Sequence, residues 1–363
     1  LFFDLRFLLF FLITILILQN EKYLKIFKVI IILCLLFLIF DTLIQSVYGK
    51  DIFGFEKSDI GRLSGPFKNE YIVGGVILKF YLIFFCVSFN NLSKINKELV
   101  LFLFISNLSL LSVLLSGERS SIALFSFLFI FSFIHLILKN KKSVLVFVLT
   151  VILFLPFYLK NSNFMLDRFN NIAKDFKSST PINIDQKNDF LNSPISYKFN
   201  KLKILYYNYG YSAHYYSAYS LFKDNIFFGV GQRNYRIACK NIESKPETIE
   251  ILKDIDKNKI KKFLDNLCTT HPHQAYFEIL SETGLLGLIF FSLIIIYTFI
   301  NIIKSKNRYL IGPLVIIFIP LVPTGSFFNN FNSMFLWTLL GVIQVLSIRK
   351  KFFSVHKSSQ LSY

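Results

Sequence analysis

Long apolar runs recur along the chain between short charged segments. A helix of about 20 apolar residues crosses the roughly 30 Å hydrocarbon core of a bilayer. We therefore predict an all-α polytopic membrane protein with about nine transmembrane helices. The predicted spans are 1–18, 26–47, 71–88, 99–115, 120–138, 143–159, 274–300, 309–323 and 331–348.

Basic residues gather in every second connection between the predicted spans. They are Lys22, Lys25, Lys28, Lys94, Lys97, Lys139, Lys141, Lys142, Lys304, Lys306, Arg308, Arg349, Lys350 and Lys351. Short loops rich in Lys and Arg remain on the cytoplasmic side of a membrane. We therefore expect residue 1 and the other connections to lie outside and the C-terminus inside. The outward connections are 48–70, 116–119, 160–273 and 324–330.

The one sizeable polar region is the outer segment 160–273, which is rich in Asn, Lys, Asp and Tyr. It separates N-terminal transmembrane helices (1–159) from C-terminal transmembrane helices and a cytoplasmic tail (274–363). A connection this long is usually functional or a small domain of its own. Within it, the aromatic residues of 206–222 predict a short interfacial or surface helix. Residues 243–265 predict an exposed helical excursion.

Composition agrees with a membrane protein. The chain has 363 residues, of which 54% are hydrophobic. Its formal net charge of +18 would suggest nucleic acid as a partner of a soluble protein. Here the lysines of cytoplasmic loops account for it, so we expect the bilayer and no nucleic acid. The sequence begins with Leu1 instead of Met, so we expect chain before it and identify no separable signal peptide.

Two of the four cysteines lie in the predicted outer segment. Cys239 and Cys268 are 29 residues apart and enclose the helical excursion. In an oxidising compartment a disulfide between them would stabilise the fold by about 3 kcal/mol. The alternative is two unpaired thiols. Cys34 and Cys86 lie inside predicted spans, where buried thiols are expected.

A pair of histidines precedes the seventh predicted span. His271 and His273 flank Pro272, and with Cys268 they could contribute three zinc ligands. A fourth ligand and a second pair at helical spacing are absent from the sequence around them. We therefore predict no metal and no cofactor at this position.

The same histidine begins a longer motif. His273-Gln274 is followed by nine residues and then by Gly284-Leu-Leu-Gly287 at the start of a predicted span. This spacing resembles the signature of the O-antigen ligase and polymerase superfamily. Further stretches are similar to that family: "GRLSGPFKNEYIVGG" (61–75), "SGERSS" (116–121) and "FGVGQRNYR" (228–236). The resemblance covers about residues 60 to 345; the family has about twelve spans, of which about nine are visible here.

The resemblance implies a metal-independent glycosyltransferase of the bacterial inner membrane with its active site facing the periplasm. The donor would be an undecaprenyl-diphosphate-linked glycan. In a ligase the acceptor is lipid A-core, in a polymerase a second lipid-linked glycan, and a protein O-oligosaccharyltransferase is a further variant. The sequence has no Walker motif, which favours a lipid-linked donor over a nucleotide sugar. A non-enzymatic exporter is the alternative class, but its charges should lie within the membrane, and here they gather at the outer edge.

Arginines on the predicted outer face are candidates for binding a diphosphate. Arg62, Arg119, Arg233 and Arg236 each carry a planar guanidinium that suits the oxygens of a diphosphate. We assign catalytic roles to Arg119 and Arg233 and substrate binding to Arg62 and Arg236. Capping or snorkelling is the alternative for Arg119 and, more strongly, for Arg62. Arg233 and Arg236 share one short stretch, so one of them alone could face the substrate.

His273 is the predicted catalytic base, because an imidazole with a pKa near neutrality can accept a proton from an attacking sugar hydroxyl. The alternative is a hydrogen-bonded histidine at a helix start. Glu278 and Glu282 lie four residues apart on the predicted helix. Either could pair with an arginine or orient a hydroxyl, or both could form structural salt bridges.

The remaining candidates are weaker. His271 is a substrate-binding candidate, although Pro272 turns the chain beside it and favours a structural role. His214 lies among tyrosines that could line an acceptor-sugar groove. Gly284 and Gly287 are predicted to permit close packing of helices.

Overall fold

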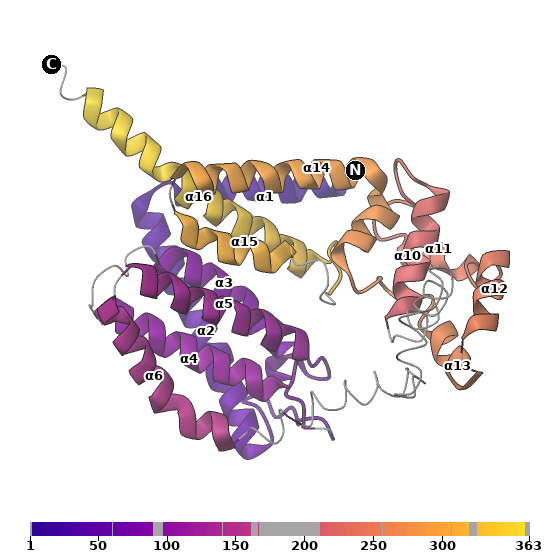
Figure 1. Cartoon of the computed structure of the whole chain (residues 1–363), viewed down its shortest axis with the longest axis horizontal. Helices are drawn as coiled ribbons and strands as arrows, with labels where there is room; N and C mark the ends of the chain where they lie inside the picture. Colours follow the sequence, from indigo (N-terminus) through magenta and orange to yellow (C-terminus); the bar gives the residue numbers. More distant parts are fainter. Residues whose placement is uncertain are drawn as a thin grey trace, which may run out of the picture. The chain divides into compact units, whose positions relative to one another are not determined.

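The computed structural model describes residues 2–59, 61–89, 97–139, 141–160, 166, 211–255, 257–305, 307–318 and 325–359. Over these ranges the regular structure is helical (Figure 1). An isolated antiparallel bridge joins Lys50 to Glu56. The all-α prediction is therefore confirmed for the described part of the chain. Contacts divide the chain into two compact units. The first unit is Leu1–Arg168, Ile295–Ile319 and Met334–Tyr363, and the second is Phe169–Ile294 and Pro320–Ser333.

The first unit is a set of apolar helices. They are α1 (Phe2–Leu18), α2 (Glu21–Tyr48), α3 (Val73–Phe89), α4 (Lys97–Ser116), α5 (Arg119–Lys139), α6 (Lys141–Lys160), η4 (Arg308–Leu310) and α15 (Ile311–Phe318). Two further helices pass from the second unit into the first: α14 (Ala275–Ser305) and α16 (Asn330–Ser359).

Five helices of the described chain are long and apolar enough to cross a membrane. They are Glu21–Tyr48, Lys97–Ser116, Arg119–Leu138, Ala275–Ser305 and Asn330–Ile348. The other predicted spans fall on shorter apolar helices, at Arg6–Leu18, Val73–Phe89, Ser143–Leu159 and Arg308–Phe318. The structure thus supports a multi-pass membrane protein, while the number of spans remains a prediction.

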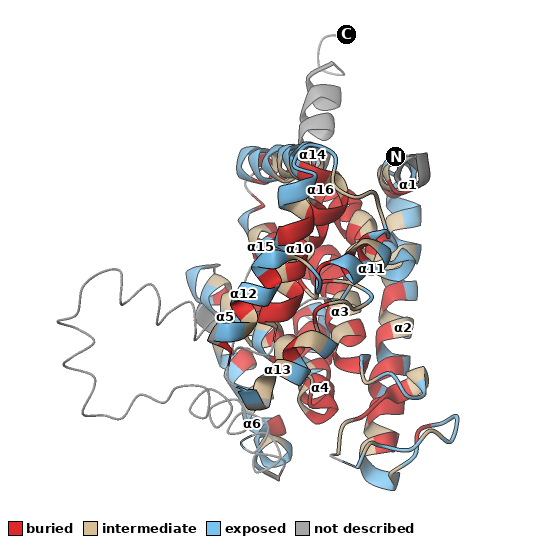
Figure 2. Ribbon diagram, turned by 90° about the vertical axis from the view of Figure 1, so that its right-hand side faces the viewer, coloured by how far each residue is buried: buried red, intermediate tan, exposed pale blue. Residues whose placement is uncertain are grey.

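Several polar side chains inside these helices are paired within the helix or with a neighbouring helix. The hydroxyl groups of Ser106 and Ser109 on α4 donate to the carbonyls of Phe102 and Ile105 at 2.7 and 2.8 Å. Tyr81 on α3 donates its hydroxyl to Ser106 Oγ at 2.8 Å, which ties α3 to α4. Figure 2 shows both helices largely buried. Internal pairing of this kind is what allows polar side chains inside an apolar bundle.

The connection after α2 is held by polar side chains near the end of that helix. Gln45 Nε2 donates to the carbonyl of Phe55 and to Ser64 Oγ, each at 3.0 Å, and Gln45 Oε1 accepts from the backbone N–H of Gly65 at 2.8 Å. Asp41 Oδ1 accepts from a backbone N–H of the same connection, at 2.9 Å. The connection is therefore anchored on both sides of Arg62. A short helix, η1 (Gly65–Phe67), follows it.

The second unit has its own core, built from short helices. They are α10 (Ser212–Asp224), α11 (Tyr235–Ala238), η3 (Cys239–Asn241), α12 (Pro246–Asp254) and α13 (Lys257–Asp265). The buried residues at its centre are Ala213, Ala218, Leu221, Tyr235, Cys239, Ile242, Ile251, Ile255, Phe263 and Leu267. The predicted aromatic helix of 206–222 is described only from residue 211 onward.

The predicted excursion of 243–265 is helical, but it is wrong to describe it as simply exposed. Ile251 and Ile255 are spaced by four residues, and they bury one face of the segment in the core with Phe263. Charged residues cover the opposite faces of α12 and α13, as expected for amphipathic surface helices. The segment is therefore an integral part of the second unit.

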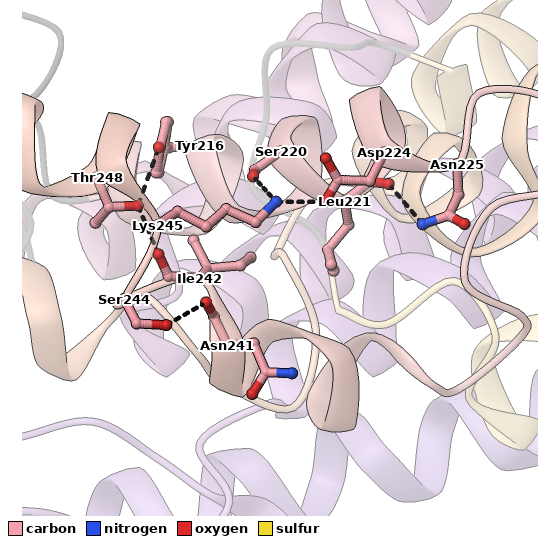
Figure 3. A network of polar contacts seen from close by, with 10 residues as sticks. All are labelled: Tyr216, Ser220, Leu221, Asp224, Asn225, Asn241, Ile242, Ser244, Lys245 and Thr248. Carbon is pink, nitrogen blue, oxygen red and sulfur yellow. Dashed lines mark hydrogen bonds and ion pairs between the residues drawn. The ribbon is translucent and has the colours of Figure 1, made fainter.

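Polar contacts also fasten this segment to α10 (Figure 3). Lys245 forms an ion pair with Asp224 and donates to Ser220 Oγ at 2.9 Å. Tyr216 Oη lies 3.1 Å from Thr248 Oγ1, whose hydroxyl in turn donates to a backbone carbonyl. These contacts fix the start of α12 against α10.

Candidate active site

The helix that follows the two histidines is broken at Gly284. This residue has φ 67° and ψ −164°, a backbone conformation essentially restricted to glycine. Before the break, α14 starts at a side-chain cap, since Gln274 Oε1 accepts from the backbone N–H of Phe277 at 2.8 Å. The residue after His273 in the motif therefore fixes where the helix begins.

A loop about fifty residues earlier in the chain, residues 226–231, supplies hydrogen-bond partners on both sides of the break. The backbone N–H groups of Leu285 and Leu286 donate to the carbonyls of Ile226 and Phe227 at 2.8 and 3.3 Å. On the other side of the break, two N–H groups of this loop donate to carbonyls of α14, Val230 to Ser281 at 2.8 Å and Gly231 to Glu282 at 2.9 Å. Two of the backbone groups left over at each new helix end are thus paired.

Glycines allow the two backbones to approach this closely. A Cβ atom on Gly284 would lie 2.3 Å from the carbonyl oxygen of Phe227, and one on Gly229 would lie 2.4 Å from the carbonyl carbon of Glu282. Gly287 lies against Thr283 of its own helix. Gly284 therefore serves the loop docked in the break instead of the close packing of two helices that we expected.

Glu278 and Glu282 are buried beside the break, with 1% and 2% of their surfaces exposed. Glu282 accepts from the backbone N–H groups of Arg233 at 2.6 Å and Tyr235 at 3.2 Å. Among the described contacts, the partners of both glutamates are mainly backbone amides, and the arginine pairing that was one of the sequence alternatives is not seen as an ion pair.

Glu278 plays the matching role for a second loop. It accepts from the Ser326 hydroxyl at 2.6 Å and from the backbone N–H of Phe327 at 2.7 Å. The two glutamates therefore hold two different loops against one helix.

Arg233 is itself a fixed group. Its φ of 60° places it in the left-handed region, which is uncommon outside glycine. Its Nε and Nη2 atoms donate to the Phe328 carbonyl at 3.2 and 2.9 Å, and Nη2 also donates to Asn330 Oδ1. Three of its five N–H donors are thus used within the protein, which orients the other two. Arg236, on α11, is exposed.

The three histidines of the second unit form one cluster. The ring of His273 lies 4.1 Å from that of His271 and 4.8 Å from that of His214, measured between centroids. Tyr211 lies 5.8 Å from both His214 and His273. His273 has φ 55°, so its backbone is also in the left-handed region. No group of three or more His, Cys, Asp or Glu suited to a metal ion occurs in the described ranges.

Neighbouring threonines fix the rings around His273. Thr269 Oγ1 lies 3.3 Å from Nδ1 of His214 and donates to the carbonyl of His271 at 3.0 Å. Thr270 Oγ1 lies 2.9 Å from Nδ1 of His271. His214 exposes only 5% of its surface and packs against the His273 ring. This burial differs from the expectation that His214 lies in an open acceptor-sugar groove.

Burial favours the neutral form of two of these histidines, His214 and His273. It lowers the pKa of His273. Burial, and secondarily the nearby His273, lower the pKa of His214 to about 4, against the opposing effect of a hydrogen bond with the Asn266 backbone. A neutral imidazole has a free lone pair at neutral pH, which a proton acceptor needs.

A disulfide joins Cys239 to Cys268, with their Cα atoms 5.1 Å apart. Cys239 directly follows the helix that carries Arg236, and Cys268 lies five residues before His273. The crosslink therefore fastens the histidine segment to the short helices after Arg233.

The other two arginines belong to the first unit. Arg62 donates from Nη2 to the Tyr71 carbonyl at 2.7 Å, and its guanidinium lies 5.3 Å from the centroid of the Tyr71 ring. Arg119 is half-buried at the start of α5. Among the described residues, no hydrogen-bond partner meets the buried Nε atom of either arginine.

Glu118, which the sequence interpretation overlooked, lies next to Arg119. Its carboxylate accepts from the backbone N–H of Gly75 at 2.6 Å. Burial raises the pKa of Glu118, against the opposing effects of this hydrogen bond and of nearby cationic groups that include Arg62. A Cβ atom on Gly74 would lie 2.3 Å from Ser116 Oγ. The adjacent glycines at 74 and 75 were the sequence signal for this close approach.

The second unit thus brings His214, His271 and His273 into one cluster, and Glu278, Glu282 and Arg233 into another. A search of curated proteins found no match, and a search of solved structures also found none. A family model described as O-antigen ligase matches residues 104–292, more than half of the chain. The match includes Arg119, Arg233 and the whole His273–Gly287 motif, whereas Arg62 lies outside it. The chain therefore belongs to the O-antigen ligase family, a group of glycosyltransferase-like membrane ligases and polymerases.

Proposed function

We propose that the protein transfers a glycan from undecaprenyl diphosphate to an acceptor hydroxyl at the periplasmic face of the bacterial inner membrane. One observation carries the proposal: His273, in the family motif, is half-buried and held by His271 and His214 at the start of α14. Its lowered pKa supports a neutral imidazole able to accept a proton.

The reaction is a direct displacement at the anomeric carbon. His273 takes the proton of the acceptor hydroxyl as its oxygen forms a bond to that carbon. The bond from the carbon to the diphosphate oxygen breaks, and the electron pair leaves on undecaprenyl diphosphate. Attack from the face opposite the leaving group inverts the configuration.

Arginines would offset the negative charge that develops on the leaving diphosphate. Arg233 suits this role because its partners fix the guanidinium and leave two N–H donors for a ligand. Arg119 and Arg62 carry buried Nε donors without a partner among the described residues, and we propose that they also bind the diphosphate. The exposed Arg236 would contribute through its charge. The glutamates Glu278 and Glu282 are proposed to act indirectly, by positioning the loops that bind substrate.

The acceptor decides between related activities. We propose lipid A-core, which makes the protein a ligase. A second lipid-linked glycan would make it a polymerase, and a protein hydroxyl would make it an O-oligosaccharyltransferase. A non-enzymatic exporter is disfavoured by the family match.

The test is genetic. His273→Ala and Arg119→Ala are introduced separately in the native host, and surface polysaccharide is examined on a gel. We expect both variants to lose polysaccharide on lipid A-core. Unmodified core with accumulated lipid-linked polymer indicates a ligase, and core capped by a single repeat indicates a polymerase. Normal long-chain polysaccharide in both variants would contradict the catalytic assignment.

A further inference from the structure

The break at Gly284 marks where the charged side chains of α14 end and a long, mainly apolar stretch begins. The preceding turns carry Glu278, Ser281 and Glu282, whereas residues 284–303 contain no charged side chain. At 1.5 Å per residue, this stretch is about 30 Å long, the thickness of the hydrocarbon core of a bilayer. The hydrocarbon-crossing part of α14 therefore begins at the break.

The loop docked in the break must lie at the same depth in the membrane as the start of this stretch of α14. Ile226 and Phe227 accept backbone hydrogen bonds from Leu285 and Leu286, the first residues of the apolar stretch. Because the two backbones are directly hydrogen-bonded, the loop cannot lie at a different depth from Leu285 and Leu286. This part of the loop therefore meets the boundary of the hydrocarbon together with α14.

The side chains of this loop are apolar and exposed. Ile226, Phe227 and Phe228 expose 46%, 63% and 72% of their surfaces. Polar residues bound them on either side, with Asp224 and Asn225 before and Arg233 after. Large apolar residues are also exposed along the apolar part of α14: Leu286, Ile289, Phe290 and Leu293. The exposed surface of the loop thus continues the surface that α14 presents to lipid.

The backbone of the loop is suited to this position. Non-helical backbone is tolerated at membrane depth only when its polar groups are paired. The carbonyls of Ile226 and Phe227 are paired with α14, and the N–H of Gly229 donates to the carbonyl of Asn225 at 2.9 Å. Aromatic side chains are moreover enriched at the edge of the hydrocarbon.

We propose that residues 226–228 are a membrane-contacting loop whose side chains insert between lipid acyl chains where α14 enters the bilayer. The loop anchors the second unit to the bilayer at the break in α14. This assignment does not depend on the catalytic role of His273.

The test uses one tryptophan as a depth probe. Trp337, the only native tryptophan, is replaced by Phe, and Phe228→Trp or Phe227→Trp is introduced into the full chain. Each protein is reconstituted in phosphatidylcholine vesicles with acyl chains brominated near the headgroup, in the middle or near the end. Ile249→Trp is the matched control, since Ile249 is also exposed in the second unit but lies on α12 beside charged residues.

We expect both loop probes to show blue-shifted emission and to be quenched several-fold more strongly than the Ile249→Trp control. Quenching should be strongest for bromine near the headgroup. Emission typical of water with no more quenching than the control would overturn the proposal. Blue-shifted emission without quenching by brominated lipid would also overturn it, because the loop would then be covered by protein.

Discussion

The carboxylate of Glu282 accepts the backbone N–H of Arg233 at 2.6 Å, and the Arg233 guanidinium donates to the carbonyl of Phe328. Glu282, a buried acid on α14, thereby fixes the backbone position of Arg233. The Arg233 side chain in turn binds a third segment, the one that contains Phe328. Glu278 binds that third segment directly, through Ser326 and Phe327. The position of Arg233 thus depends on the two glutamates, even though neither is paired with it as an ion pair.

Substitution of Glu282 by Gln tests this dependence. The amide keeps one acceptor but turns an N–H group toward a backbone N–H, so we expect a loss of about 1–3 kcal/mol of stability. Thermal unfolding of the purified protein measures it. Glu250→Gln, at an exposed position on α12, should leave the unfolding temperature unchanged. Equal effects of the two substitutions would contradict the positioning role.

Gly284→Ala should be more damaging than an ordinary glycine substitution. A left-handed φ costs alanine about 1–2 kcal/mol, and here the new Cβ would also meet the Phe227 carbonyl at 2.3 Å. Gly54→Ala is the matched control, because Gly54 has φ 85° and nothing within 4 Å of its Cβ position. We expect the Gly284 variant to unfold at a clearly lower temperature than the Gly54 variant. Similar unfolding temperatures would show that the loop does not dock in the break.

The disulfide should stabilise the second unit. The Cys239–Cys268 crosslink closes a loop across a sequence separation of 29 residues. Removing it gives the unfolded chain more conformational freedom, for which we expect a loss of about 3 kcal/mol of stability. Cys239→Ser with Cys268→Ser should lower the unfolding temperature, and reductant should then have no further effect. Cys34→Ser, at a free cysteine, is the control. If neither reductant nor the double substitution lowers the unfolding temperature, the disulfide does not have this stabilising role.

Acid should destabilise the histidine cluster. In the folded protein the pKa of His214 is about 4, whereas in the unfolded chain it is about 6.5. Between these values the unfolded state binds more protons, so stability rises with pH and is lost as pH falls from about 6.5 toward 4. His214→Gln should flatten this part of the stability–pH curve. A curve identical to that of the native protein would contradict the burial of His214 in the cluster.

Helices were largely predictable, since apolar runs of spanning length leave little alternative to them in a membrane. The break at Gly284 was not, because the pattern from 274 to 300 predicts one uninterrupted span. It exists only because residues 226–231, distant in sequence, supply the missing hydrogen bonds. The backbone partners of Glu278 and Glu282 were hidden for the same reason.

The burial of α12 and the candidate base are visible in the sequence pattern. The four-residue spacing of Ile251 and Ile255 is that of a helix with one buried face, so the burial of α12 was available from the pattern. The motif around His273 identified the candidate base, but the ring contacts with His214 depend on the tertiary fold. The roles of the arginines remain predictions, since no ligand contact follows from sequence or fold alone.

The central claim is that His273 removes the proton of the acceptor. The most direct measurement is the initial rate of glycan transfer by purified protein in proteoliposomes, from an undecaprenyl-diphosphate-linked donor to lipid A-core. His273→Ala should lower the rate by about 10²- to 10⁴-fold, the usual contribution of a general base. Lys240→Ala, at an exposed position next to Cys239, should leave it unchanged. A His273→Ala rate close to that of the native protein would contradict the claim.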